Sequence, residues 1–367
     1  MVVPSLAAGG AERAVQRLTA GFLRRGHHVC VVTTNPAPDF YELPGAADRI
    51  RLWLTGSRPG EGGRPQNLLK TMGFLARTLP AYWRTLSATR PDIVIAQLEQ
   101  IGILTLLRPR LGWPVVVVEQ NDARMNPIGM IWRILRRLTY RRAAYVVSVS
   151  AGIDGFFGWI PASKRRIIHN PVELADVSAV GEPPPDIPVG PYVIAMGRLT
   201  RQKGFDLLLE ACAKVLPRAP HWRLAILGEG PDRHALEERA TRLGLADRVL
   251  FLGTRRDPRP YLAGAAIFVL SSRWEGFPMA LLEAMSVGTP SVSFDCPSGP
   301  SEIITHDEDG LLLPPEDVAG MSVALTELIE DDTKRVRLGR AASQSVARFG
   351  VEAVVVRWED QVFLELS

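Results

Sequence analysis

The sequence of 367 residues contains few cysteines, few histidines and no long apolar runs. Its three cysteines, Cys30, Cys212 and Cys296, lie far apart, so they predict no disulfide framework and fit a reducing compartment. No group of His, Cys and carboxylates has the spacing of metal ligands, and we expect no metal cofactor. No apolar run can cross a bilayer and no secretory signal pattern is present, which predicts a cytoplasmic protein.

Charge is divided unequally along the chain. Residues 1–180 carry 23 Lys and Arg against 12 Asp and Glu, whereas residues 181–367 carry 20 against 27. The basic half favours an anionic partner such as nucleic acid, a membrane surface or a phosphorylated substrate. A chance imbalance between two halves is the alternative.

Short apolar runs alternate with helical patterns throughout the chain. They predict strands at 2–6, 29–34, 93–96, 115–118, 145–149, 192–196, 223–227, 249–252, 266–270 and 291–294. The four valines of 115–118 are typical of a parallel strand buried on both faces. Because the segment 181–191 is too rich in proline for a helix or a central strand, we predict a linker there. The sequence therefore predicts two doubly wound α/β domains, 1–180 and 192–349, and a final helix within 350–367.

Two helical segments of the first half are rich in arginine. The first, 68–86, is amphipathic, and Pro80 is expected to interrupt it. In the second, 127–142, apolar residues recur at helical spacing and arginines fill the other positions: Ile131, Ile134, Leu135 and Leu138, with Arg133, Arg136, Arg137, Arg141 and Arg142. Such a helix either lies on anionic lipid or turns its apolar side to the core and its basic side to solvent.

The stretch from Ser271 to Pro290 carries the strongest motif. Glu275-Gly276-Phe277-Pro278 forms a turn between the strand 266–270 and a helix rich in Ala, Leu and Met. A helix N-terminus offers free N–H groups to an anionic or polyhydroxylated ligand. Glu283 can accept two hydroxyl hydrogen bonds, as a ribose diol would offer. The alternative is that Glu275 caps the helix and Glu283 faces solvent.

Polar or glycine-containing turns follow several other predicted strands, where doubly wound sheets bind ligands. Gly9-Gly10 would let a helix N-terminus approach a phosphate, or form a plain tight turn. Arg198 and Lys203 would meet an oxyanion such as a diphosphate, or be solvated surface charges. Gly228 lies in a tight loop that brings a ligand close to the backbone. Glu119-Gln120-Asn121-Asp122 either points into a cleft or caps the next helix, and Asp307-x-Asp309 is interpreted as a solvated loop.

Four of these motifs stand in the order found in the retaining glycosyltransferases of family 4, which the chain resembles over essentially its whole length. They are Gly9-Gly10-Ala11-Glu12-Arg13, Gly197-Arg198 with Lys203-Gly204, Glu275-x₇-Glu283, and Ser298-Gly299-Pro300-Ser301-Glu302 followed by Gly310. The resemblance implies the GT-B fold, in which two Rossmann-like domains face a cleft. It also implies that the final helix, 350–367, packs back on the first domain.

By this resemblance, the second domain binds a nucleoside-diphosphate sugar, here expected to be UDP-linked. Glu283 would hold the ribose, and Arg198 and Lys203 would stabilise the diphosphate leaving group in place of a metal. Glu275 would orient the sugar. The N–H groups of Gly276 and Phe277 would help to orient it, and Gly228 would also contact the donor. Gly9 and Gly10 would close the cleft from the first domain.

One departure from the family pattern bears on the acceptor. Many members have a His after the strand that here ends in Glu119. The sequence at this place is similar to a subgroup that acts on polyprenyl-diphosphate-linked saccharides, often with N-acetylhexosamine donors. This implies a lipid-linked or polysaccharide acceptor, with Glu119 and Asn121 on the acceptor side. It further implies that Arg136 and Arg137 face an anionic membrane, at the inner side of the cytoplasmic membrane, and that nucleic acid is not a partner.

Two other functions are compatible with the same fold. A nucleotide-sugar 2-epimerase needs no acceptor, so it would leave a basic membrane face without a role. A non-catalytic nucleotide-sugar-binding protein would be expected to lose Arg198, Lys203 or one of the two glutamates of the motif, and this chain has all four.

Overall fold

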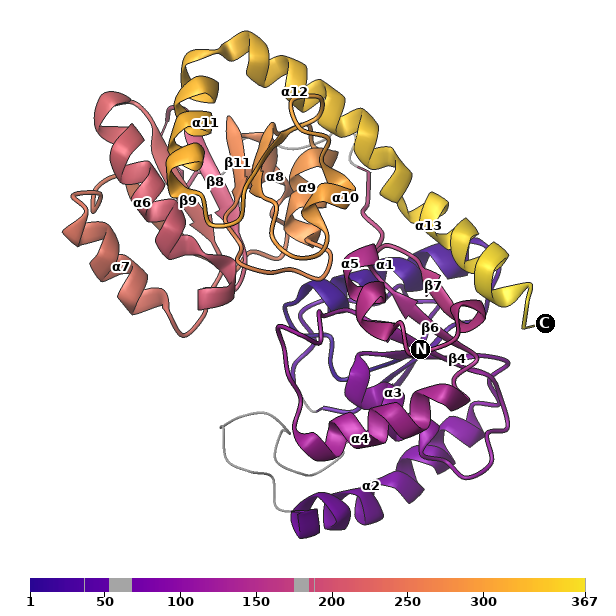
Figure 1. The fold of residues 1–367 in the computed structure, drawn as a ribbon. Helices are drawn as coiled ribbons and strands as arrows, with labels where there is room; N and C mark the ends of the chain where they lie inside the picture. Colours follow the sequence, from indigo (N-terminus) through magenta and orange to yellow (C-terminus); the bar gives the residue numbers. More distant parts are fainter. Residues whose placement is uncertain (36, 53–67, 175–184, 188, 367) are drawn as a thin grey trace. The chain divides into compact units, whose positions relative to one another are not determined.

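A computed structural model describes residues 1–367 except 36, 53–67, 175–184, 188 and 367, and in helix α2 (Leu68–Ala88) it leaves out the side chains of 68–72, 74 and 75 (Figure 1). The chain forms two compact units, Met1–Pro171 with Val351–Ser367, and Val172–Gly350. The division therefore precedes the boundary expected after residue 180. The N–H of Val172 donates to the carbonyl of Phe349 at 2.8 Å, which ties this segment to the second unit. Much of the predicted linker 181–191 lies outside the described residues.

The first unit is built on a seven-stranded sheet whose paired strands are all parallel. In spatial order the strands are β3 (Asp48–Arg51), β2 (Cys30–Thr33), β1 (Val2–Val3), β4 (Val94–Gln97), β5 (Val115–Glu119), β6 (Tyr145–Ser148) and β7 (Arg165–Ile167). The valines of β5 are fully buried, as a central strand with both faces covered requires.

Helices cover both faces of this sheet: α1 (Gly10–Arg24), α2, α3 (Glu99–Leu106), α4 (Met130–Thr139), α5 (Ala151–Asp154) and α13 (Val351–Trp358). The last of these packs on α1, where a Cβ at Gly21 would lie 2.5 Å from a methyl group of Val355. Ion pairs from Arg24 to Glu352 and from Arg25 to Glu359 flank this contact. The C-terminal segment is therefore part of the first unit.

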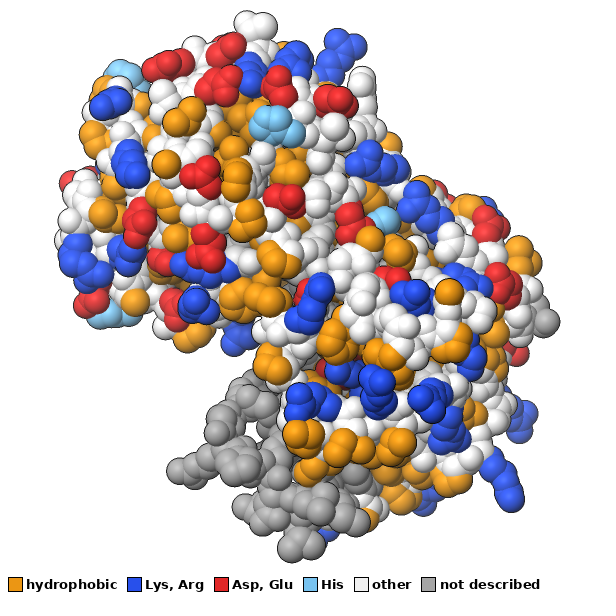
Figure 2. All heavy atoms as spheres, viewed as in Figure 1, with side chains coloured by type: hydrophobic (Ala, Val, Ile, Leu, Met, Phe, Trp, Pro, Cys, Tyr) orange, Lys and Arg blue, Asp and Glu red, His pale blue; other side chains and the backbone are white. Residues whose placement is uncertain are grey.

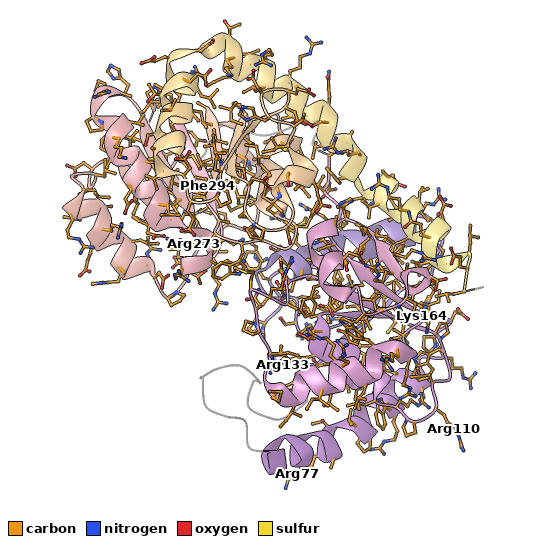
Figure 3. All side chains as sticks on the ribbon, viewed as in Figure 1. Arg77, Arg110, Arg133, Lys164, Arg273 and Phe294 are labelled. Atoms are coloured by element: carbon orange, nitrogen blue, oxygen red, sulfur yellow. The ribbon has the colours of Figure 1, made fainter. Side chains whose placement is uncertain are left out.

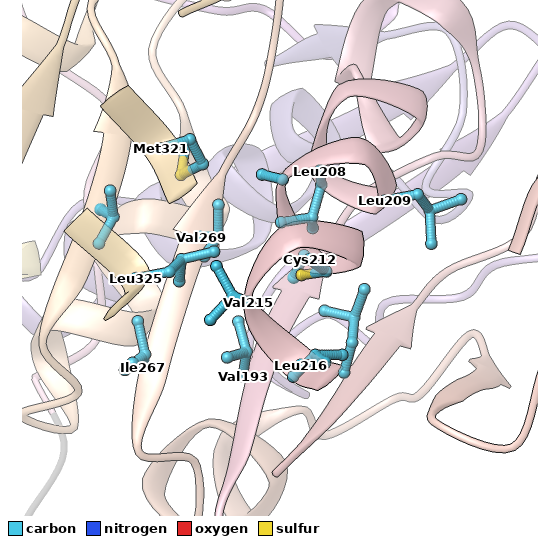
Figure 4. Packing of buried hydrophobic residues seen from close by; sticks show 14 of the residues in the cluster. Val193, Leu208, Leu209, Cys212, Val215, Leu216, Ile267, Val269, Met321 and Leu325 are labelled. Carbon is cyan, nitrogen blue, oxygen red and sulfur yellow. The ribbon is translucent and has the colours of Figure 1, made fainter. Parts of the chain in front are cut away.

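The second unit has a six-stranded parallel sheet. Its order is β10 (Val249–Gly253), β9 (Arg223–Leu227), β8 (Tyr192–Met196), β11 (Ile267–Leu270), β12 (Ser291–Phe294) and β13 (Leu311–Leu313). The helices are α6 (Phe205–Val215), α7 (Arg233–Arg242), α8 (Arg259–Ala263), α9 (Met279–Ser286), α10 (Pro300–Ile303), α11 (Val318–Glu330) and α12 (Asp332–Ser345). Figure 4 shows the core, in which Leu208 and Cys212 of α6 pack with Val269 of β11 and Leu325 of α11.

The helix α2 differs from its prediction. It runs without a break from Leu68 to Ala88, so the expected interruption at Pro80 is wrong. Packing just after the proline holds the helix in place. Tyr82 is fully buried with its hydroxyl 2.6 Å from that of Thr105 in α3, and the indole N–H of Trp83 donates to the carbonyl of Leu104.

Candidate donor site

The loop that follows β11 holds a buried carboxylate paired with a lysine. Glu275 is only 5% exposed, and its Oε1 accepts from the Nζ of Lys203 and from the Oγ of Ser272, each at 2.6 Å. Lys203 lies 72 residues earlier, after β8. Because neighbouring parallel strands end at the same sheet edge, β8 and β11 bring these two charges together. The alternative that Glu275 caps α9 is wrong, because no side chain caps that helix.

A set of backbone contacts fixes the lysine against this loop. Gly204 ends the short 3₁₀ turn Arg201–Lys203 with φ of +63°, and a Cβ there would lie 2.0 Å from the carbonyl oxygen of Ser271. The N–H of Arg273 donates to the carbonyl of Gln202 at 2.8 Å, and the amide of Gln202 donates to the carbonyl of Trp274 at 2.9 Å. These contacts join the two loops directly.

Arg273, labelled in Figure 3, makes further contacts between the same two loops. Its guanidinium donates two hydrogen bonds to Asp206, at 2.8 and 2.7 Å, and a third to the carbonyl of Arg201. The sequence analysis missed Ser272, Gln202 and Arg273. These residues lie inside the motif segments but have no recognisable role in the sequence, because the partners of Gln202 and Arg273 lie 72 and 67 residues away along the chain.

The other cation of the motif, Arg198, is exposed on the loop that follows β8. The preceding Gly197 lies under the aliphatic part of Lys203, since a Cβ at Gly197 would be 3.2 Å from that side chain. Gly228, after β9, has φ of +140°, and a Cβ there would lie 1.9 Å from the carbonyl oxygen of Gly197. Gly230 is similarly confined, because a Cβ there would lie 2.2 Å from the carbonyl oxygen of Leu199. These glycines let the β8 and β9 loops touch backbone to backbone.

The residues just before α9 lie at the same end of the sheet, where the strands have their carboxyl ends. Gly299, with φ of +102°, packs against the backbone of Gly276 and Phe277 at 3.2 and 3.3 Å from its would-be Cβ. Phe277 is buried edge-on to Phe349. Glu283, on α9, is only 3% exposed, so the alternative that it faces solvent is wrong. Its negative charge is one of the causes that raise the pKa of Arg259, the first being that residue's hydrogen bond to Asp257.

A cysteine lies beside the paired charges. Cys296 follows β12 and is buried. Burial, and after it the negative charge of Glu275, raises the pKa of the Cys296 thiol. The thiol is therefore neutral at physiological pH and adds no charge to the site.

In the first unit, Gly9 and Gly10 begin α1 as expected. A carboxylate lies over this helix start. A Cβ at Gly9 would be 2.2 Å from Oε2 of Glu12, and burial raises the pKa of Glu12. A glycine at position 9 therefore makes room for Glu12, and a phosphate at this helix start would have to share the place with that carboxylate.

The residues after β5 do not match their prediction in full. Glu119 is 3% exposed and accepts a hydrogen bond from the hydroxyl of Tyr140, so the interpretation that it points into an open cleft is wrong. Burial, and after it the charge of Glu99, raises the pKa of Glu119 to about 8. Asn121 is exposed, and its place on the acceptor side stays a prediction. The carboxylate of Asp122 is buried and accepts from Arg124 at 2.7 Å.

Helix α4 is turned in an unexpected direction. Arg136 is buried, paired with Glu99 of α3 and stacked 4.8 Å from the ring of Phe156. The prediction that Arg136 faces a membrane is therefore wrong. Trp132 and Thr139 share its buried side. The helix instead exposes Met130, Ile134 and Leu138 by 62, 53 and 65%.

The exposed side of α4 combines apolar and basic residues. Arg137 is exposed over the ring of Trp159 at 5.0 Å, and Arg133 and Arg141 are exposed near it. Over the position of α4, Figure 2 shows a row of Lys or Arg side chains above a band of hydrophobic ones. The interpretation that the apolar side packs into the core is wrong for Ile134 and Leu138, because Trp132 takes that place.

Within the described residues, no group of three or more His, Cys, Asp or Glu could hold a metal ion. Asp307 pairs with Lys334 and Arg337, whereas Asp309 is buried and accepts from the N–H of Thr305 at 2.7 Å. The solvated interpretation of this loop is therefore wrong for Asp309. None of the helices in the described part of the chain is both long and apolar enough to span a bilayer.

Comparisons with known proteins identify the family of this chain. Two family models match, one described as "Glycosyl transferase 4-like domain" over residues 9–171 and one as "Glycosyl transferases group 1" over residues 187–345. A lipopolysaccharide core biosynthesis glycosyltransferase of Rhizobium meliloti is 36% identical over 308 residues, which cover 81% of this chain and 86% of that protein. The chain therefore belongs to the glycosyltransferase family that these two models describe.

Other relatives and solved structures match over different shares of the chain. An N-acetyl-D-galactosaminyltransferase of Campylobacter jejuni, whose name gives an undecaprenol-diphosphate-linked saccharide, is 24% identical over 360 residues, covering 97% of this chain and 96% of that protein. A sucrose-phosphate synthase structure from Thermosynechococcus elongatus matches with a TM-score of 0.81 at 22% identity, covering 99% of this chain and 95% of that one. This likeness shows the GT-B fold. Several other relatives match over only 22 to 47% of their own length.

Proposed function

We propose that this glycosyltransferase moves a sugar, with retention and without a metal, from a UDP-linked donor to a lipid-linked or polysaccharide acceptor. The observation that carries the proposal is the ion pair of the half-buried Lys203 with the buried Glu275, at the carboxyl ends of β8 and β11. Arg198 lies on the loop after β8 and Glu283 is buried on α9. Together, these two cations and two carboxylates suit a diphosphate, a sugar and a ribose.

The chemistry follows from these charges. The bond between the anomeric carbon and the diphosphate oxygen breaks, and Arg198 and Lys203 stabilise the negative charge that the diphosphate takes up. The acceptor hydroxyl attacks from the same face of the sugar and gives its proton to the departing diphosphate. Glu275 is already held by Lys203 and Ser272, so it is placed to orient sugar hydroxyls without moving itself.

The donor assignment is tested at Glu283. Because a carboxylate that accepts two hydroxyls contributes about 1.5–3 kcal/mol per bond, Glu283→Gln is expected to weaken UDP binding by about tenfold or more. Calorimetry with UDP measures this directly. Glu238→Gln, on the exposed side of α7, is the matched control and should bind UDP as the wild type does. Equal affinities in all three proteins would contradict the ribose assignment.

Metal independence has its own measurement. If Arg198 and Lys203 replace a metal, turnover should be the same in EDTA as in Mn²⁺. The donor in this assay is the nucleotide sugar that binds the protein most tightly. A loss of turnover in EDTA that Mn²⁺ restores would overturn this part of the proposal.

For the acceptor, we propose that α4 holds the first unit on an anionic membrane that carries the lipid-linked saccharide. The support is the exposed stripe of Met130, Ile134 and Leu138 beside Arg133 and Arg137. Apolar side chains that enter the headgroup region next to cations give the binding pattern of an interfacial helix. The full-length match to the Campylobacter relative supports the same kind of acceptor.

The membrane proposal predicts a loss of vesicle binding when the stripe is made polar. Since each buried aliphatic side chain contributes about 1.5–3 kcal/mol, changing Ile134 and Leu138 to serine should weaken cosedimentation with vesicles containing phosphatidylglycerol by more than tenfold. Val336→Ser removes an equally exposed apolar side chain, 65% exposed on α12, and should change nothing. An equal effect of both changes would contradict the assignment of α4.

A further inference from the structure

The first unit has an open pocket of about 560 Å³ at the C-terminal ends of α2 and α3. Three arginines, Arg84, Arg90 and Arg108, line it together with Trp83, and its lining contains no acidic residue. None of the described carboxylates forms an ion pair with these three arginines. The pocket therefore gathers positive charge that no carboxylate of the described residues neutralises.

One of the three arginines is held in place with hydrogen-bonding capacity left over. The guanidinium of Arg108 stacks 4.4 Å from the ring of Trp113. Its Nη1 is buried and has no hydrogen-bond partner within the described chain. Since a buried donor without an acceptor is costly, the guanidinium of Arg108 keeps a donor that the described chain leaves unsatisfied.

The loop that carries Arg108 is fixed from behind. Arg142, after α4, donates to the carbonyl oxygens of Arg108 and Pro109 at 2.6 and 3.0 Å. A fourth guanidinium thus lies at the back of this loop. Its hydrogen bonds hold the backbone of Arg108, so the pocket wall on this side is preformed.

Another residue that lines the pocket has a strained backbone. Arg90 follows the end of α2 with φ of +44°, a left-handed conformation that side chains disfavour and in which glycine is usual after a helix. An arginine is present there in spite of this strain. Strained positions of this kind concentrate at ligand sites.

The pocket is separate from the sheet edge that carries the acceptor-side residues. Arg90 precedes β4 and Arg108 precedes β5, so both lie beside the amino ends of these strands. Asn121 follows the carboxyl end of β5. A ligand in the pocket therefore binds at the opposite edge of the same sheet.

We propose that this pocket binds a phosphate or diphosphate group, with Trp83 covering the apolar or saccharide part of the same molecule. Guanidinium groups bind phosphate oxygens through paired hydrogen bonds, and three of them without a competing carboxylate make a strong site for such an anion. The phosphate belongs either to a lipid headgroup or to a soluble phosphorylated compound. The proposal is independent of the donor site in the second unit.

The test compares two double variants that remove the same charge. Arg84→Ala with Arg108→Ala removes two pocket arginines, whereas Arg77→Ala with Arg110→Ala removes two exposed arginines outside it, both labelled in Figure 3. Both pairs are made in a Lys203→Ala background, which weakens anion binding by the second unit. Binding is measured by calorimetry with pyrophosphate and by cosedimentation with vesicles of phosphatidylglycerol and phosphatidylcholine.

We expect the pocket variant to bind its anion at least tenfold more weakly and the control variant to bind as the parent does. Loss of pyrophosphate binding in the pocket variant alone would support a soluble phosphorylated ligand. Selective loss of phosphatidylglycerol vesicles, with no pyrophosphate binding in the parent, would support a headgroup. Equal effects of the two variants would show diffuse surface charge only, and absence of binding to either probe would also overturn the proposal.

Discussion

Replacing Lys203 with alanine is expected to lower kcat by about 10²–10³-fold, because in the proposed function Lys203 is a preorganised cation at the leaving diphosphate. The same change leaves Glu275 buried without its partner at 2.6 Å, which adds repulsion toward the incoming donor. The measurement is the release of nucleoside diphosphate at saturating donor and acceptor, together with thermal unfolding to show that the variant is folded.

A neighbouring cation gives the matched control for this experiment. Arg201 lies in the same 3₁₀ turn but is exposed, and it takes part in the loop contacts through its backbone carbonyl. Arg201→Ala should keep kcat within about twofold, since surface substitutions of this kind change little. If Lys203→Ala also stayed close to the wild-type rate, the assignment of the diphosphate site would be wrong.

The second large effect is expected on stability. Arg136→Ala should reduce the free energy of unfolding by about 3–5 kcal/mol, because removing one partner of a buried ion pair leaves the other charge uncompensated. The carboxylate left without a partner is that of Glu99, whose side chain is only 13% exposed. The variant also loses the packing of the guanidinium on Phe156. Urea unfolding followed by tryptophan fluorescence measures the loss in the transition of the first unit.

Two further variants separate charge from packing. Arg133→Ala on the exposed side of α4 should change the free energy of unfolding by no more than about 0.5 kcal/mol. The double change Glu99→Gln with Arg136→Met removes both charges and should recover most of the stability. An Arg136→Ala variant as stable as Arg133→Ala would show that the buried pair contributes nothing.

The fold was largely predictable because its central strands are short apolar runs. The strands 192–196, 223–227 and 291–294 agree with β8, β9 and β12 at both ends. The three strands that were missed, β3, β7 and β13, lie at sheet edges. Two of them have little apolar signal, since β3 reads Asp-Arg-Ile-Arg and β7 reads Arg-Arg-Ile. Edge strands are half covered, so apolar content identifies them poorly.

The donor site was partly predictable for a different reason. Lys203 and Glu275 were recognised through motifs of the family, and the structure pairs them directly. The orientation of α4 was not predictable, because helical spacing assigns apolar residues to the core. Arg136 is buried only because Glu99, 37 residues away, supplies its countercharge, and no local pattern reveals such a partner.

The glycine contacts at the carboxyl ends of the strands in the second unit limit how the substrate preference of this enzyme can change. Gly204, Gly228, Gly230 and Gly299 each bring one loop against the backbone of another, with no space for even a methyl group. Lengthening or exchanging any one of these loops would separate its neighbours as well. A new donor preference must therefore arise by exchanging side chains on an unaltered backbone and not by grafting loops.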